Sequence, residues 1–147
     1  MKNYDENIKR LRKQIYLTIE KGGLGHIASC YSCLEILYTL YLKKVMNYNP
    51  DNCKDEKRDR LILSKGHAGV ALYQVMCEAG LLKEEELRTY LQPGTHLGGE
   101  PCMRDLPCVE ASTGSLGHGL SMAVGMAIAQ KVDDSEARTF VILGDGE

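Results

Sequence analysis

The sequence lacks the features that mark several broad classes of protein. It has no excess of charge of one sign, since 18 basic residues stand against 20 acidic ones along 147 residues. No basic block of the kind that binds nucleic acid or a membrane surface is present. No apolar run is long enough to cross a bilayer, and the polar N-terminal stretch does not resemble a signal peptide. These absences predict a cytoplasmic protein with no nucleic-acid partner and no membrane partner.

Two nucleotide-binding motifs are also missing. The chain contains no G-x-x-x-x-G-K-[ST] loop, which argues against an NTPase, and no G-x-G-x-x-G, which argues against a dinucleotide site. It has no internal repeat and no low-complexity segment. Its length is close to that of one domain with a real hydrophobic core. We therefore expect one domain, or most of one.

The cysteines allow two specific interpretations. There are six, at positions 30, 33, 53, 77, 102 and 108. Cys30 and Cys33 with Cys102 and Cys108 could form a zinc site, but the first pair falls in an apolar helical pattern and the second pair is widely spaced. A thioredoxin-like motif would need a strand before Cys30, whereas glycines precede it. Free thiols in a reducing compartment are the simpler expectation.

Apolar periodicity predicts helices that alternate with strands. In residues 4–21, for example, Ile8, Leu11, Ile15 and Ile19 recur at helical spacing. Helices are expected at 4–21, 29–44, 83–90 and 117–131 and around Leu72–Ala79, strands at 61–63, 109–111 and 139–143, and loops at 47–60 and 92–108. This alternation predicts an α/β fold, a parallel sheet with flanking helices.

One candidate ligand site follows the last predicted strand. Open parallel sheets bind ligands at the carboxyl ends of their strands, and Gly144-Asp145-Gly146 directly follows 139–143. A carboxylate between glycines can offer a hard oxygen ligand while the backbone stays open to a diphosphate. The same three residues also suit a tight turn without a ligand. Both interpretations remain open from these residues alone.

A second candidate lies in the glycine-rich block Ser112–Gly119, which leads into the helix at 117–131. Its glycines let the backbone approach a ligand closely, and a helix N-terminus favours anions. A tight turn with close helix packing would explain the block equally well.

The four histidines form a third candidate. All of them, His26, His67, His96 and His118, stand in glycine-bearing loops rather than on apolar helix faces. Histidine suits proton transfer near neutral pH and hydrogen bonding to hydroxyl or phosphate oxygens. We therefore expect the four side chains to share one polar pocket.

These residues stand in blocks that resemble those of transketolases in order and spacing. The blocks are Gly25-His26, residues 59–68, residues 110–119 and Gly144-Asp145-Gly146. The resemblance implies a thiamine-diphosphate-binding α/β fold that stops after the Gly-Asp-Gly strand. Residues 1–147 would then form the N-terminal part of the diphosphate-binding domain, and the pyrimidine-binding domain would be absent.

The resemblance also implies how the cofactor is held. Asp145 would ligate the Mg²⁺ (or Ca²⁺) that holds thiamine diphosphate, with Gly144 and Gly146 near the diphosphate oxygens. Gly114 would hydrogen-bond the aminopyrimidine through its backbone. Leu116 would pack against the cofactor rings.

Two histidines receive catalytic roles from the same resemblance. His67 would contact the diphosphate and lie near the donor sugar, and His26 would help to move protons to and from the substrate. Such enzymes transfer a two-carbon ketol unit from a ketose donor to an aldose acceptor. The implied activity is that of a transketolase.

The sequence departs from the family pattern at the donor site. Transketolases usually carry Gly-His-Pro in the loop before Leu106-Pro107, whereas this chain has Gly99-Glu100-Pro101. A carboxylate at Glu100 disfavours the usual donor contact unless His96 takes it over. The donor could therefore be xylulose 5-phosphate, another sugar phosphate, or a modified ketose with a sulfonate or a branched chain.

The other departure concerns completeness. The family's metal site also uses an Asn about one βα unit beyond Gly-Asp-Gly, which the 147 residues do not contain. We therefore expect activity only with a C-terminal transketolase subunit that carries the pyrimidine-binding domain, in a homo- or hetero-oligomer. The alternatives are a non-catalytic fragment that only pairs with a partner chain, and 1-deoxyxylulose-phosphate synthase, whose match to 64–68 and 114–119 is poorer.

Overall fold

The computed structural model describes residues 2–147, with side chains from Tyr4 onward. Met1, the first residue of the predicted domain, lies outside the described residues. The elements along the chain are α1 (Lys2–Gly22), α2 (Ile27–Leu42), β1 (Arg60–Leu63), the 3-10 turn η1 (Gly66–Ala68), α3 (Gly69–Glu78), α4 (Glu84–Leu87), α5 (His118–Val132) and β2 (Thr139–Ile142). The predicted alternation of helices and strands is therefore confirmed.

Three helices build the main hydrophobic core. Ile8, Leu11, Ile15 and Ile19 of α1 are all buried, as their three- and four-residue spacing requires on one helix face. They pack with α2 and α3. Tyr73 of α3 belongs to this core and is fully buried.

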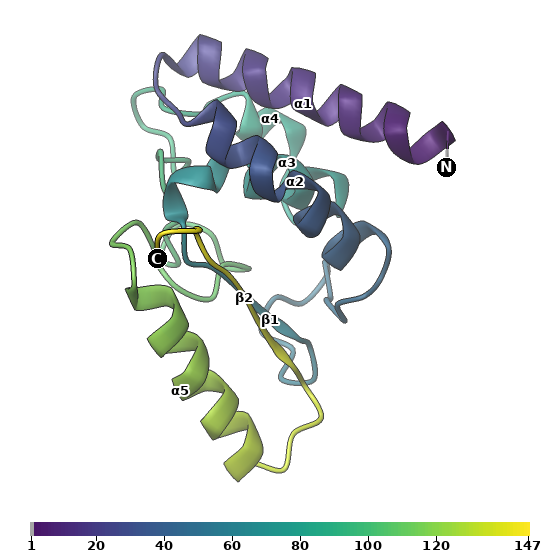
Figure 1. The fold of residues 1–147 in the computed structure, drawn as a ribbon, viewed down its shortest axis with the longest axis vertical. Coiled ribbons are helices and arrows are strands. Elements are labelled where there is room, and N and C mark those ends of the chain that lie inside the picture. The colour runs from purple at the N-terminus through teal and green to yellow at the C-terminus, as the bar shows by residue number, and fades with distance from the viewer. Residues whose placement is uncertain (1) are drawn as a thin grey trace.

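The two strands form a parallel pair. Arg60 lies opposite Thr139 and Leu63 lies opposite Ile142. Leu61 and Leu63 belong to the core of α1 to α3, whereas Ile62 joins a second cluster with α5. Successive strand side chains point to opposite faces, so β1 separates the two layers. Figure 1 shows α5 on one side of the strands and α1 to α4 on the other.

Helix α5 packs on the strands through small side chains, as its glycine and alanine content suggests. Its buried residues are Gly119 and Ala123. Larger apolar side chains are exposed at intervals of four residues, at Leu120, Val124, Ile128 and Val132. Despite this apolar character, none of the helices in residues 2–147 is both long and apolar enough to cross a membrane.

Two secondary-structure predictions are wrong. Residues 109–111 form no strand, and only Glu110 and Ala111 are bends, because Val109 N donates to Leu106 O (3.0 Å) in a local turn and not to a neighbouring strand. The helix expected at 83–90 is only α4, four residues long. After Arg88 the next amides bond three residues back, as Thr89 N does to Glu86 O (2.9 Å), which tightens the chain into turns.

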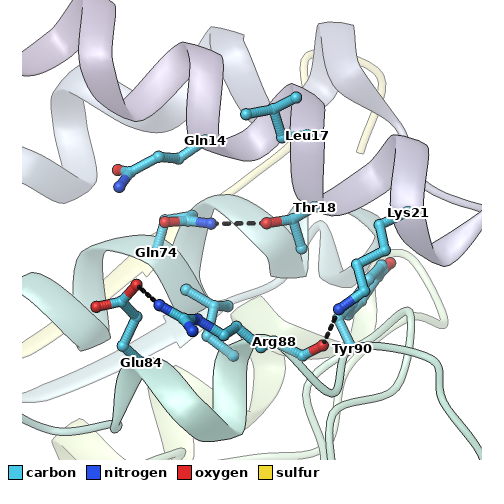
Figure 2. Close-up of a pocket in the computed structure, with 9 residues that line it drawn as sticks. Gln14, Leu17, Thr18, Lys21, Gln74, Glu84, Arg88 and Tyr90 are labelled. Atoms are coloured by element: carbon cyan, nitrogen blue, oxygen red, sulfur yellow. Dashed lines mark hydrogen bonds and ion pairs between the residues drawn. The ribbon is translucent and has the colours of Figure 1, made fainter.

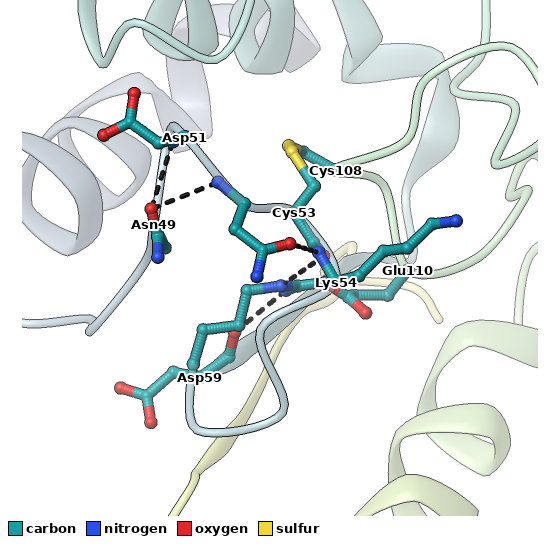
Figure 3. Close-up of a disulfide and its surroundings, with 9 residues drawn as sticks. Asn49, Asp51, Cys53, Lys54, Asp59, Cys108 and Glu110 are labelled. Carbon is teal, nitrogen blue, oxygen red and sulfur yellow. Dashed lines mark hydrogen bonds and ion pairs between the residues drawn. A yellow bond between two sulfur atoms is a disulfide. The ribbon is translucent and has the colours of Figure 1, made fainter.

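The expectation that all cysteines are free is wrong for one pair. Cys53 and Cys108 form a disulfide with Cα atoms 4.9 Å apart, shown in Figure 3. The fold brings the 47–60 loop beside the end of the 92–108 loop, a proximity that a sequence separation of 55 residues conceals. Cys30 and Cys33 are free and buried, and burial raises the pKa of Cys33 to about 11. Such a thiol is unreactive at neutral pH.

Candidate cofactor site

A cavity of about 440 Å³ lies where both strands end. It is lined by Ala28, Ser29, Ser32, Lys65, His67, Leu116, Gly144, Asp145, Gly146 and Glu147. The turn after β1, the turn after β2 and the first turns of α2 thus face one another, at the edge of a parallel sheet where ligands usually bind. The last residues of the chain end beside η1 and the start of α5 (Figure 1).

Glycines allow the backbone segments of this site to touch. A Cβ on Gly66 would lie 2.6 Å from the backbone N of Gly114, closer than any real side chain can approach. Gly117 caps α5 with a left-handed φ of 84°, a conformation that glycine adopts without strain. The glycine-rich block at 112–119 therefore packs directly against the turn that carries His67.

Two of the four histidines meet at this site. The ring centroids of His26 and His67 lie 5.2 Å apart in an edge-to-face arrangement. Burial, together with the nearby His26 and Lys65, lowers the pKa of His67 below its ordinary value. The neutral imidazole is thereby favoured, so His67 is able to accept a proton or a hydrogen bond near neutral pH.

The other two histidines lie elsewhere, so the prediction of one shared pocket is wrong for them. His96 Nε2 lies 3.2 Å from Glu86 Oε1, beside α4. His118 is exposed at the start of α5, with Nδ1 3.2 Å from Leu116 O. Neither side chain lines the cavity. All four histidines stand in loops next to glycines. This shared sequence context does not show which of the loops lie close together in the fold.

Glu100 lies next to the predicted cofactor-binding Gly114. Its carboxylate is so close that a Cβ on Gly114 would overlap it, and Gly114 itself has a φ of 143°. Glu100 is exposed. An anionic group therefore stands at the glycine-rich edge of the site, where the family pattern has a histidine.

Lys65 is a site residue to which the sequence reasoning assigned no role. Its side chain is only 8% exposed, yet it lines the cavity and donates from Nζ to Ser32 Oγ (2.8 Å). A buried ammonium group next to an open cavity attracts anions. The available sequence signal was a lysine two residues after a buried strand.

Glu147 is the second residue that the sequence reasoning missed. Its carboxylate accepts hydrogen bonds from Ser64 Oγ, from Gly117 N (2.9 Å) and from Gly144 N (2.7 Å). Burial would raise the pKa of Glu147, but these donors outweigh it and hold the pKa below its ordinary value. Only its place after Gly-Asp-Gly could have pointed to it.

Asp145 fits a metal ion whose remaining coordination positions are filled by phosphate oxygens and water. It is exposed at the turn after β2 and lines the cavity. Within residues 2–147, no group of three or more His, Cys, Asp or Glu side chains converges on a metal position. Magnesium in phosphate sites commonly takes one or two carboxylates, with phosphate oxygens and water supplying the rest. The Asp145 carboxylate shares the cavity with Lys65 and with open glycine backbone, which matches that chemistry.

A second cavity, of about 260 Å³, lies between α1 and the α3–α4 region. Its polar groups already satisfy one another, as Figure 2 shows: Gln74 donates to Thr18 (2.9 Å), and Lys21 donates to the backbone O of Arg88 (3.0 Å). Arg88 in turn donates to Glu84 (2.7 Å). The cavity at the strand ends is therefore the better candidate for chemistry.

Comparisons with known proteins agree with this geometry. Two similar proteins are an apulose-4-phosphate transketolase subunit of Phocaeicola vulgatus, 42% identical over 97% of this chain and 49% of that protein, and a 6-deoxy-6-sulfo-D-fructose transketolase subunit of Clostridium sp., 42% identical over 93% of this chain and 50% of that protein. The solved transketolase of Campylobacter jejuni is 30% identical to this chain and superposes with a TM-score of 0.87. The match covers 99% of this chain and 24% of the Campylobacter jejuni chain.

The chain thus spans about half the length of the curated relatives it matches. The family model described as "Transketolase, thiamine diphosphate binding domain" matches residues 4–147, nearly the whole sequence. The chain therefore belongs to the transketolase family, in its N-terminal, thiamine-diphosphate-binding portion.

Proposed function

We propose that this chain is the cofactor-binding N-terminal part of a thiamine-diphosphate- and Mg²⁺-dependent transketolase. It would act in the transfer of a two-carbon ketol unit from a ketose donor to an aldose acceptor, in the cytoplasm. The observation that carries the proposal is the shared cavity. His67, Leu116 and the Gly144–Gly146 turn come from distant parts of the chain and line one space.

The residues at the strand ends suit a metal diphosphate. Asp145 would hold Mg²⁺ through its carboxylate, and Gly144 and Gly146 leave the backbone accessible to diphosphate oxygens. Lys65, which lines the same cavity, would add positive charge. Thiamine diphosphate, when bound, supplies the electron sink for breaking and forming carbon–carbon bonds, while the protein supplies binding and orientation.

The remaining walls suit the organic part of the cofactor and the sugar. Gly114 would offer its backbone to the aminopyrimidine, and the exposed apolar side chain of Leu116 would cover the rings. His67, kept neutral by its surroundings, would accept a proton or a hydrogen bond from the donor. His26, in contact with His67, would exchange that proton onward.

The activity would require a second chain. Both of the similar proteins described above are named as transketolase subunits rather than as whole transketolases. Their names support a C-terminal partner that carries the pyrimidine-binding domain. The complete site would then form in a homo- or hetero-oligomer.

Calorimetry with thiamine diphosphate and Mg²⁺ tests this function. We expect tight, Mg²⁺-dependent binding when the full-length protein is combined with its pyrimidine-domain partner, and weak or no binding without that partner. Ketol transfer should appear only in the combined sample. Absence of binding in the combined sample would contradict the enzymatic function. It would favour the alternative of a non-catalytic chain that only pairs with a partner chain.

The donor is proposed to be a modified or branched ketose rather than xylulose 5-phosphate. Two similar proteins are named for apulose 4-phosphate and for 6-deoxy-6-sulfo-D-fructose. In this chain the Glu100 carboxylate stands against Gly114, where it would accept hydrogen bonds from donor hydroxyls. Glu100 would therefore determine donor specificity.

Replacing Glu100 by His is expected to shift the donor preference toward xylulose 5-phosphate. Because the change removes a negative charge and adds a hydrogen-bond donor, the ratio of kcat/KM values for the two donor types should change by about 10-fold or more. Steady-state kinetics with paired donors measures the ratio. Glu56→His, at an exposed position in the 47–60 loop, is the matched control. An unchanged ratio in Glu100→His would show that Glu100 does not select the donor.

A further inference from the structure

The Glu147 carboxylate connects three segments that are far apart in the sequence. Oε1 accepts from Ser64 Oγ, in the turn after β1, and from Gly117 N, at the start of α5 (2.9 Å). Oε2 accepts from Gly144 N, at the end of β2 (2.7 Å). Each segment also contributes a wall or a support to the cavity. One side chain therefore spans the whole site.

The donors are groups that need such an acceptor. Gly117 N belongs to the first amides of a helix, which have no partner within the helix. Gly144 N follows the last strand residue, Ile142, by two positions, beyond the β1–β2 pairing. Hydrogen bonds from amides to an ionised carboxylate are stronger than those between neutral groups. Glu147 thus satisfies two backbone amides at once.

The local backbone aims the carboxylate at these donors. Glu147 N donates to Gly144 O (3.3 Å), which closes a turn around Asp145 and Gly146. The Glu147 side chain then folds back on the same turn through Gly144 N. Glu147 and Asp145, the residue proposed to hold the metal, therefore belong to the same hydrogen-bonded turn.

We propose that Glu147 is a positioning residue, which fixes the Asp145 turn against the His67 turn and the start of α5 before any ligand binds. It does not need to touch the cofactor or the substrate. The identity of the ligand rests on the function proposed above, whereas the positioning itself is a property of the free protein.

Glu147→Gln in the full-length protein tests this role. A glutamine offers only one acceptor oxygen, so its NH₂ must face either Gly117 N or Gly144 N, and one amide loses its partner. In the ligand-free protein, hydrogen exchange at Gly117 or Gly144 should accelerate about 10-fold, with exchange in α1 to α3 unchanged. Affinity for thiamine diphosphate with Mg²⁺ should fall about 10-fold or more, as with other residues that orient metal ligands, while kcat at saturation changes little.

Two further variants separate positioning from general stability. Glu136→Gln, an exposed carboxylate between α5 and β2, should change neither exchange nor affinity. Ser64→Ala should weaken affinity by itself, and its effect should not simply add to that of Glu147→Gln, because the two side chains are hydrogen-bonded to each other. If Glu147→Gln fails to fold, Ser64→Ala carries the same expectations of local exchange and weaker affinity.

The outcomes distinguish this inference from the proposed function. Unchanged exchange at both glycine amides, or acceleration spread evenly over the chain, would overturn the positioning role. Locally faster exchange in Glu147→Gln supports it, even if the unaltered protein with its partner binds no thiamine diphosphate. That last result would refute only the proposed function.

Discussion

Replacing Asp145 by Asn is expected to abolish Mg²⁺-dependent binding of thiamine diphosphate. Asp145 is the only carboxylate in the Gly144–Gly146 turn and lines the cavity at the strand ends. Asparagine keeps the size of the side chain but loses the negative charge that a hard divalent cation requires. The affinity of the full-length protein with its partner should fall by about 100-fold or more, as measured by calorimetry at fixed Mg²⁺.

The fold should survive this change. Asp145 is exposed, and surface substitutions away from special features alter stability by about 0.5 kcal/mol or less. Asp133→Asn, an exposed residue just after α5, is the matched control and should leave cofactor affinity unchanged. If Asp145→Asn binds thiamine diphosphate as tightly as the unaltered protein, Asp145 is not the metal ligand.

Replacing Asp59 by Asn is expected to lower the free energy of unfolding more than the other substitutions discussed for this protein. Asp59 is 2% exposed, and its carboxylate accepts from Asn47 N (2.9 Å), Arg138 N (2.7 Å) and Arg138 Nη2 (2.6 Å). It thereby joins the residue before β1 to the residue before β2. An asparagine would direct its NH₂ at one of these donors, so the free energy of unfolding should fall by about 3 kcal/mol.

Urea unfolding measures the loss. Arg138→Gln should cost less than Asp59→Asn, because the Arg138 side chain is 56% exposed and its backbone hydrogen bond remains. Asp51→Asn, exposed in the same loop, should change stability by about 0.5 kcal/mol at most. Equal stability of Asp59→Asn and Asp51→Asn would contradict the proposed role of Asp59 in fixing the strands.

The same residue predicts a pH dependence. Burial would raise the pKa of Asp59, but hydrogen bonds from Arg138 and Asn47 outweigh it and place the pKa below the ordinary 3.8. The stabilisation by Asp59 is therefore fully present above about pH 4 and is lost as the pH falls through 3.8 and then through the lower folded-state pKa. Asp59→Asn should lack this component of the acid transition.

Local patterns were sufficient to predict most of the elements. The spacing of Ile8, Leu11, Ile15 and Ile19 identified α1, because a helix with one buried face repeats every three to four residues. The short apolar run Leu61–Leu63 identified β1 for a similar reason. Prediction failed at 109–111, where hydrogen bonds to nearby residues, and not side-chain preference, decided the conformation.

The site was predicted only in part, and that part came from the motifs rather than from periodicity. Residues of the motifs that resemble transketolases, such as His67 and Asp145, do line one cavity. Chemical character alone did not distinguish His67 from His96, which pairs with Glu86 instead. The importance of Lys65 and Glu147 depends on their partners Ser32, Ser64 and Gly117, and those partners are distant in sequence.

The sequence by itself determined the family, the helices, the strands and the residues that can carry the chemistry, because periodicity and motifs act over short distances along the chain. Only the tertiary structure decided which loops meet. It placed His26 against His67, joined Cys53 to Cys108, and brought the Glu147 carboxylate to the ends of both strands. These contacts depend on how the layers pack around β1 and β2, and this packing cannot be predicted from a local sequence pattern.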